Sequence, residues 1–185
     1  MTAYRTCKQI NKKLIIVGQG ASVQKDGSLL PNTDPDFRLP PGNWEYRGYA
    51  DIETRKKLMS EAIATFTPTE YMECFAGTHI ESRLSGTPVI TTDFGVFPGT
   101  VENGKDGYRC NTLDDFVGAA RVIHRINRKL VRKRAERYLL DNVKWDYQRW
   151  FEDLHNVYLS KKYDKLVGWH GIRTKRPVWR NKIKW

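Results

Sequence analysis

Short apolar runs alternate along the chain with segments whose apolar residues recur every three or four positions. A run such as Leu14-Ile15-Ile16-Val17 is rich in β-branched residues and stops at a glycine turn, which is typical of a buried parallel strand. The pattern predicts strands at 14–17, 44–49, 64–67, 88–92 and 108–110. It predicts helices at 51–61, 77–85, 113–124, 128–140 and 143–160. Residues 21–43 are rich in Pro, Asp, Asn and Gly, so we expect a long loop there.

This alternation of strands and helices predicts an α/β fold. We expect a Rossmann-like, mostly parallel sheet with helices on both faces, which binds ligands at the carboxyl ends of its strands. One such domain fits a length of 185 residues, and we place it at residues 1–160. Residues 161–185 form a basic tail that contains Trp169, Trp179 and Trp185. Tryptophans in a polar tail generally pack against another surface.

The composition is that of an ordinary globular protein, with 39% hydrophobic and 29% charged residues. No apolar run approaches the roughly 18 residues that cross a membrane. Residues 1–11 lack the apolar core of a secretory signal, so we expect a cytoplasmic protein. Cys7, Cys74 and Cys110 are widely spaced, and neither they nor the histidines have metal-ligand spacing. We therefore expect neither a disulfide framework nor a metal.

The net charge of +11 is concentrated in two segments. Residues 121–137 contain eight Lys or Arg against one Glu, and residues 161–184 contain nine against one Asp. Such a surface can meet nucleic acid, an anionic membrane surface or an acidic partner, or it can be a solvated helix face. The charge alone leaves these alternatives open.

The candidate chemistry lies between residues 68 and 107. Glu73 follows a predicted strand, Glu81 lies on the next predicted helix, and seven residues separate them. Glu45, Glu53 and Glu61 repeat the same interval, so the spacing alone carries no information. The context is distinctive, because Glu73-Cys74-Phe75-Ala76-Gly77 precedes Glu81, and Ser85-Gly86-Thr87-Pro88-Val89-Ile90 follows it.

These segments resemble the signature of family-4 retaining glycosyltransferases, in which E-P-F-G and a second Glu precede C-G-T-P-V-I and a Gly-containing loop. Thr92-Asp93-Phe94-Gly95 matches that loop, and residues 101–108 resemble the family's V-x-(D/N)-G-x-x-G turn. The resemblance covers about residues 1–125. It implies that the chain is the nucleotide-sugar-binding half of a two-domain GT-B enzyme. It also implies transfer from a nucleoside diphosphate sugar with retention, without metal or further cofactor.

The resemblance assigns roles to individual residues. Glu73 is expected to contact the donor sugar near its reacting carbon, and Glu81 to hold the ribose hydroxyls. Backbone amides that follow Glu73 are expected to cradle the diphosphate, since small residues and a helix N-terminus suit an anion. These are the amides of Phe75, Ala76, Gly77 and Thr78. Gly18, Gly20 and Tyr49 are expected to line the base and ribose pocket. The alternative is that both glutamates are solvated capping acids and that Tyr49 packs on the sheet.

The chain departs from the family pattern at three places. Cys74 and Ala76 replace the Pro and Gly of E-P-F-G, and Gly99 replaces the usual Glu. The family's G-R-x…K-G segment, whose cations neutralise the leaving diphosphate, is also missing. We expect a hexosyltransferase that is inactive as this isolated chain. It should need an N-terminal GT-B domain as partner, and the tail should pack on that domain.

Other classes fit less well. Gly18-x-Gly20 has Val23 where a dinucleotide fingerprint needs Gly, and no P-C-x-x-C follows His79-Ile80-Glu81 as a zinc deaminase requires. A nucleotide-sugar epimerase shares the architecture, but no acid and base pair is evident. A non-catalytic nucleotide-sugar-binding remnant and a basic nucleic-acid-binding protein remain as alternatives, although we do not expect nucleic acid as a partner.

Overall fold

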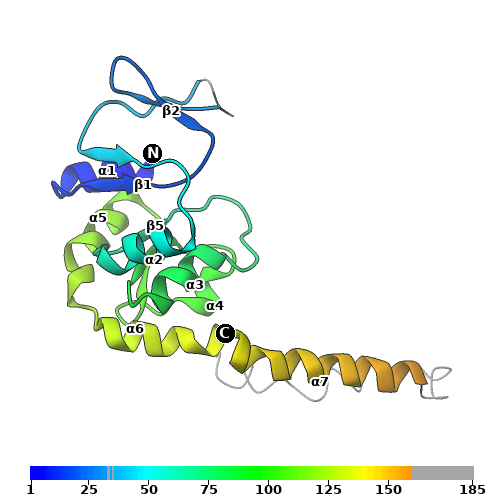
Figure 1. Cartoon of the computed structure of the whole chain (residues 1–185). Helices are drawn as coiled ribbons and strands as arrows, with labels where there is room; N and C mark the ends of the chain where they lie inside the picture. Colours follow the sequence, from blue (N-terminus) through cyan, green and yellow to red (C-terminus); the bar gives the residue numbers. More distant parts are fainter. Residues whose placement is uncertain (33, 35, 160–185) are drawn as a thin grey trace. The chain divides into compact units, whose positions relative to one another are not determined.

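The structure is a computed structural model that describes residues 1–32, 34 and 36–159, the last three as backbone only. It divides into two compact units, Met1–Arg134 and Ala135–Trp185, which are described separately. The fold is α/β, with parallel strands flanked by helices (Figure 1). The predicted fold class is therefore confirmed. The tail at 161–185 lies outside the described residues.

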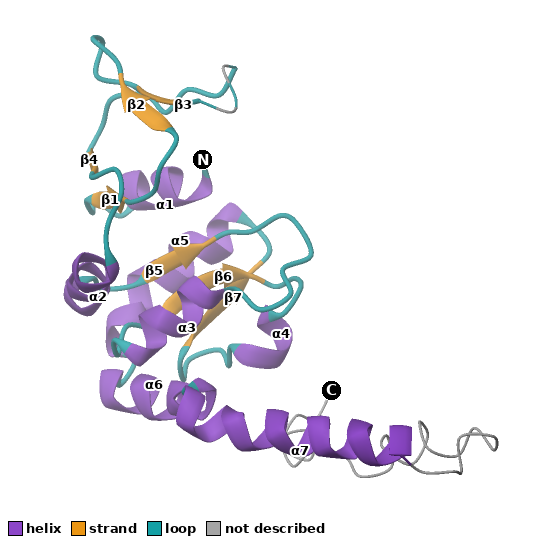
Figure 2. Cartoon of the chain, turned by 45° about the vertical axis from the view of Figure 1, so that its right-hand side comes forward, coloured by secondary structure: helices purple, strands orange, loops and turns teal. Residues whose placement is uncertain are grey.

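A three-stranded parallel sheet forms the centre of the first unit. Its strands are β5 (Thr65–Thr67), β6 (Val89–Thr92) and β7 (Gly107–Cys110), in that order. Side chains of β6 alternate between two cores. Ile90 packs with residues of α5 (Leu113–Val122) and α6 (Arg128–Ala135), whereas Val89 packs with Phe97 of α4 (Phe97–Thr100). Helices therefore cover both faces, and α3 (Gly77–Leu84) also contacts β5 and β6 (Figure 2).

Two further strands form a separate parallel pair, β1 (Leu14–Ile16) with β4 (Trp44–Tyr46). Helix α1 (Thr2–Gln9) contacts β1 and α5, and α2 (Ile52–Glu61) contacts α3. The single sheet expected from the sequence is thus two parallel sheets. Parallel pairing uses the backbone groups of alternate residues. In β1, the backbone groups of Leu14 and Ile16 bond to β4, so those of Ile15 face the open edge of that pair. In β5, the backbone of Thr65 bonds to β6, so the backbone groups of Phe66 face the open edge of the three-stranded sheet.

The loop expected at 21–43 contains a hairpin of β2 (Ala21–Val23) and β3 (Leu29–Pro31), so that expectation is partly wrong. The hairpin closes at Asp26 and Gly27, where the Gln24 N–H donates to the Ser28 carbonyl at 2.8 Å and the Ser28 N–H donates to the Asp26 carboxylate at 3.0 Å. Beside it, the buried residues Leu29 and Leu39 exchange backbone hydrogen bonds of 2.9 Å. The strand expected at 44–49 ends at Tyr46, since Gly48 turns the backbone at a φ of 61°. Helices α1 and α4 were not predicted.

The end of the chain contains the 3-10 turn η2 (Glu136–Tyr138) and α7 (Leu140–Leu159). The sequence predicts an interruption between two helices after residue 140. In the structure the interruption lies near Leu139, whose backbone is extended. The Asn142 side chain donates a 2.6 Å hydrogen bond to the Glu136 carbonyl and closes the turn. The Asp51 cap of α2 is as predicted, since its carboxylate accepts the Thr54 N–H at 2.8 Å.

Candidate functional site

The loop between β5 and α3 is organised around the Glu73 carboxylate. One of its oxygens accepts the backbone N–H groups of Phe75 and Ala76, at 3.3 Å and 3.0 Å. The other accepts the hydroxyl of Tyr71 at 2.5 Å. These hydrogen bonds, the Tyr71 bond first, hold the pKa of Glu73 below its ordinary value. The carboxylate is therefore ionised at neutral pH and fixed in orientation by its own loop.

Gly95 lies directly against the backbone of Glu73. A Cβ atom at this position would be 2.8 Å from the Glu73 nitrogen and 2.9 Å from its oxygen, and φ is 63°. The neighbouring Val96 N–H donates to the Glu73 carbonyl at 2.9 Å. Only glycine combines this backbone conformation with this close approach. The loop after β6 thus packs against and supports the loop that carries Glu73.

The first turn of α3 presents two backbone donors. Ala76 precedes the helix in the left-handed conformation, with φ 55° and ψ 68°. Among the described residues, no hydrogen bond involves the N–H of Gly77 or Thr78, and both residues are exposed. The N–H groups of Phe75 and Ala76 donate to Glu73 instead. Of the four amides expected to face a diphosphate, two are therefore open to a ligand and two are engaged.

Glu81 lies one turn into α3, with its side chain 48% exposed. Its Oε2 atom is 3.4 Å from Nε of Arg55, one turn into α2, whose side chain is 39% exposed. Sequence reasoning missed this contact, because Arg55 belongs to none of the recognised motifs. The ion pair connects the two helices that follow β4 and β5.

His79, on the inner side of α3, is completely buried. Its Nδ1 donates to the Ala76 carbonyl at 2.5 Å, and its ring meets Phe97 edge-on at 5.3 Å between centroids. Burial, followed by the charge of Arg83, lowers its pKa to about 4. The ring is therefore neutral at physiological pH, and it is a packing residue that supports the start of α3.

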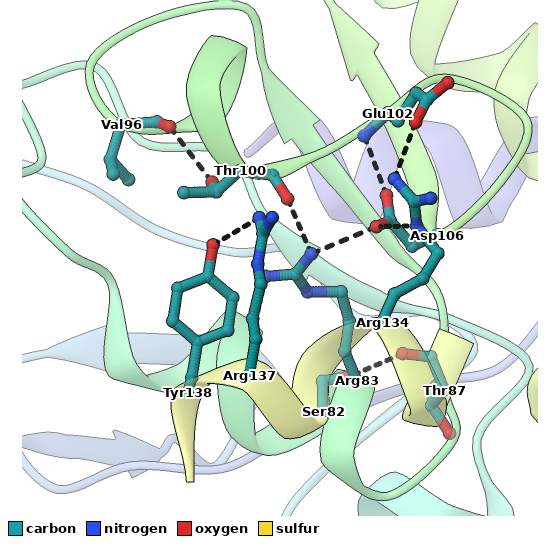
Figure 3. A network of polar contacts seen from close by, with 10 residues as sticks. All are labelled: Ser82, Arg83, Thr87, Val96, Thr100, Glu102, Asp106, Arg134, Arg137 and Tyr138. Atoms are coloured by element: carbon teal, nitrogen blue, oxygen red, sulfur yellow. Dashed lines mark hydrogen bonds and ion pairs between the residues drawn. The ribbon is translucent and has the colours of Figure 1, made fainter. Parts of the chain in front are cut away.

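A buried polar network anchors the other end of α3 (Figure 3). Arg83, which is fully buried, donates to the Thr100 carbonyl at 2.6 Å and to the Asp106 carboxylate at 3.2 Å. Asp106 also accepts from Arg134 at 2.9 Å and from the Glu102 N–H at 2.7 Å. The network joins α3 to the turn before β7 and to α6. It fixes the helix that carries Glu81.

The residues expected at the base pocket lie where β1 and β4 end. The N–H of Gly18 donates to the Gly48 carbonyl at 2.9 Å, and the Tyr46 hydroxyl donates to the Gly18 carbonyl at 2.7 Å. A Cβ atom on Gly18 or Gly20 would meet nothing within 4 Å. Tyr49 is 70% exposed. The two strand ends are thus joined, with open space beside the glycines.

Part of the basic segment 121–137 is used inside the fold. Arg128 donates to the carbonyls of Ser60 and Ala62 and to the Thr87 hydroxyl, and Arg134 bonds Asp106 and Glu102. Within the described parts of the chain, no group of three or more His, Cys, Asp or Glu side chains is placed to hold a metal ion. No helix in the same residues is long and apolar enough to cross a membrane.

Residues 2–126 match the protein family described as glycosyl transferases group 1. Spore coat protein SA of Bacillus subtilis (strain 168) is 32% identical over 98 residues, which cover 49% of this chain and 25% of that protein. The crystal structure of AviGT4, a glycosyltransferase involved in avilamycin A biosynthesis, is similar in fold, with a TM-score of 0.51 and 18% identity. That similarity covers 74% of this chain and 41% of AviGT4. The chain thus spans less than half the length of either protein.

Proposed function

Because the chain belongs to the group 1 glycosyl transferases, we propose that it is the donor-binding half of an enzyme that transfers a hexosyl group from a nucleoside diphosphate sugar to an acceptor hydroxyl. The transfer retains the anomeric configuration and uses no metal. The nucleotide lies along the carboxyl ends of β1, β4 and β5, where α/β sheets bind ligands. The acceptor is bound mainly by the other half of the enzyme.

The observation that carries this proposal is the placement of Glu73 and Glu81 around the first turn of α3. The open N–H groups of Gly77 and Thr78, at the positive end of the helix dipole, suit a diphosphate. Glu81 lies on the exposed surface of the same helix and, as an acceptor-only carboxylate, suits two ribose hydroxyls. Glu73, held by Tyr71, faces the donor sugar.

The proposal includes a partner, an N-terminal GT-B domain that closes over the donor. In this proposal the cations that stabilise the leaving diphosphate are supplied together with that domain. Loss of such stabilisation typically lowers a rate by about 10²–10³. The isolated chain therefore binds the nucleotide with little or no turnover. A non-catalytic remnant would stay inactive even after a partner domain is supplied.

The test is a thermal-shift screen of the full chain against UDP, GDP, ADP and their common sugar conjugates. At a ligand concentration about 100 times the dissociation constant, binding stabilises the fold by about 2.7 kcal/mol, which raises Tm by several degrees. We expect one nucleotide to give this shift and Glu81→Ala to abolish it. Lys56→Met, on an exposed ion pair of α2, should leave it unchanged. If no nucleotide stabilises the chain, the proposal is wrong.

A further inference from the structure

The Arg55–Glu81 contact suggests a role for Arg55 in nucleotide recognition. Arg55 and Glu81 lie one turn into helices that follow neighbouring ligand-side loops, the loop at Gly48 and Tyr49 and the loop at Glu73. A cation on α2 thus meets the carboxylate that the proposed function assigns to the ribose. Both side chains are partly exposed, at 39% and 48%, so a ligand can reach the pair.

The geometry leaves one oxygen of Glu81 for a ligand. Nε of Arg55 lies 3.4 Å from Oε2, and in the described structure no hydrogen bond or ion pair involves Oε1. A carboxylate without a fixed partner rotates among several conformations, and ordering it on binding lowers affinity. Arg55 restricts this rotation by pairing with Oε2.

Among the described residues, the only ion pair of Arg55 is the one with Glu81, although its charge also acts on Asp51. Asp51, the other carboxylate of the same helix turn, accepts the Thr54 N–H as the cap of α2. Lys56, the adjacent cation, pairs with Glu53 of its own helix at 3.7 Å. Arg55 is thus the residue by which α2 acts on α3 at this site.

We infer that Arg55 is a positioning residue that orients Glu81 toward the ribose hydroxyls and so makes the site selective for ribonucleotides. This inference rests on the proposed function. Exposed and half-exposed ion pairs contribute little individually, so we expect loss of Arg55 to change the ribose preference by about 2- to 5-fold. Arg55 acts through Glu81, so it should have no effect on a nucleotide that lacks both hydroxyls.

The test compares the affinities of UDP, GDP and ADP with those of their 2′,3′-dideoxy forms, measured by calorimetry on the full chain. Glu81→Gln should abolish most of the preference for the ribose form. Arg55→Met should reduce it by about 2- to 5-fold, and the double variant should equal Glu81→Gln alone. Arg55→Lys should restore part of the preference, because it restores the charge. Lys56→Met is the matched control on the same helix and should change neither affinity.

The outcomes separate this inference from the proposed function. If Glu81→Gln removes the ribose preference and Arg55→Met does not, Arg55 has no positioning role and the inference is wrong. If Arg55→Met weakens ribose and dideoxy forms equally, Arg55 binds the ligand directly or only supports the fold, which also overturns it. If the native chain binds no nucleotide, or shows no ribose preference, the proposed function fails and the inference fails with it.

Discussion

Replacing Asp106 with asparagine removes the charge of a buried ion pair while preserving the size of the side chain. Arg83 and Asp106 expose 0% and 2% of their side chains, so the Arg83 guanidinium would lose its counter-ion in the interior. Breaking a buried ion pair at one partner costs about 3–5 kcal/mol. Arg134 and the Glu102 N–H also bond this carboxylate, so the change affects three contacts. We expect Asp106→Asn to lower the free energy of unfolding by that amount.

Thermal unfolding followed by circular dichroism measures the effect. For a chain of this size, 1 kcal/mol shifts Tm by about 2–4 °C, so Asp106→Asn should lower Tm by about 6–20 °C. The exposed pair of Lys56 and Glu53, with side chains 69% and 80% exposed, is the control. Lys56→Met should change stability by no more than about 0.5 kcal/mol.

A second variant tests whether the loss comes from uncompensated charge. Arg83→Met combined with Asp106→Leu replaces the pair with apolar side chains, which is often neutral or stabilising. This double variant removes the uncompensated charge of Arg83, but Arg134 and the Glu102 N–H still lose their acceptor, so it should recover part of the stability that Asp106→Asn loses. A decrease in Tm of less than about 2 °C for Asp106→Asn, or a double variant as unstable as the single one, would refute the reasoning.

Three further predictions follow from single positions. The pKa of His79 is about 4 in the fold, below its unfolded value, so the unfolded chain binds the proton first as pH falls. Stability should decrease by about 2 kcal/mol from pH 7 to pH 5, and His79→Leu should remove this dependence in urea unfolding. Gly95→Ala should displace Glu73, cost about 1–3 kcal/mol in stability and abolish the nucleotide thermal shift. Amide hydrogens of Ile15 and Phe66 should exchange faster than those of their bonded strand neighbours; equal protection would show that the open edges are covered.

The strands around the candidate site could be predicted because each is a short apolar run with turn residues at its ends. Strands β5, β6 and β7 lie within one residue of the predicted bounds. The hairpin at β2 and β3 could not be predicted in this way. Each of its strands is three residues long and shows no hydrophobic alternation of its own, so the pairing of Val23 with Leu29 depends on the turn at Asp26 and Gly27. Hydrophobic periodicity reveals longer strands, whereas in this segment the turn residues dominate the sequence and favour a loop.

The missed helix α1 shows a second limit. Its sequence, Thr-Ala-Tyr-Arg-Thr-Cys-Lys-Gln, is mostly polar and has no capping side chain. Helical stability here comes from packing, since Thr6 and Cys7 are buried and the helix contacts α5. Tertiary contact overrides weak intrinsic propensity in such short helices.

The candidate site shows what a motif determines and what it leaves open. The segments around Glu73 and Glu81 predicted where a loop and a helix would meet, because small residues and strand ends mark that position in the sequence. They did not predict that Glu73 would occupy the N–H groups of Phe75 and Ala76, since this depends on a backbone conformation that places Ala76 at a φ of 55°. A diphosphate can bind these two N–H groups only if it displaces the Glu73 carboxylate. The anion-binding capacity of this loop therefore depends on the geometry of Glu73 as well as on the residue types that follow it.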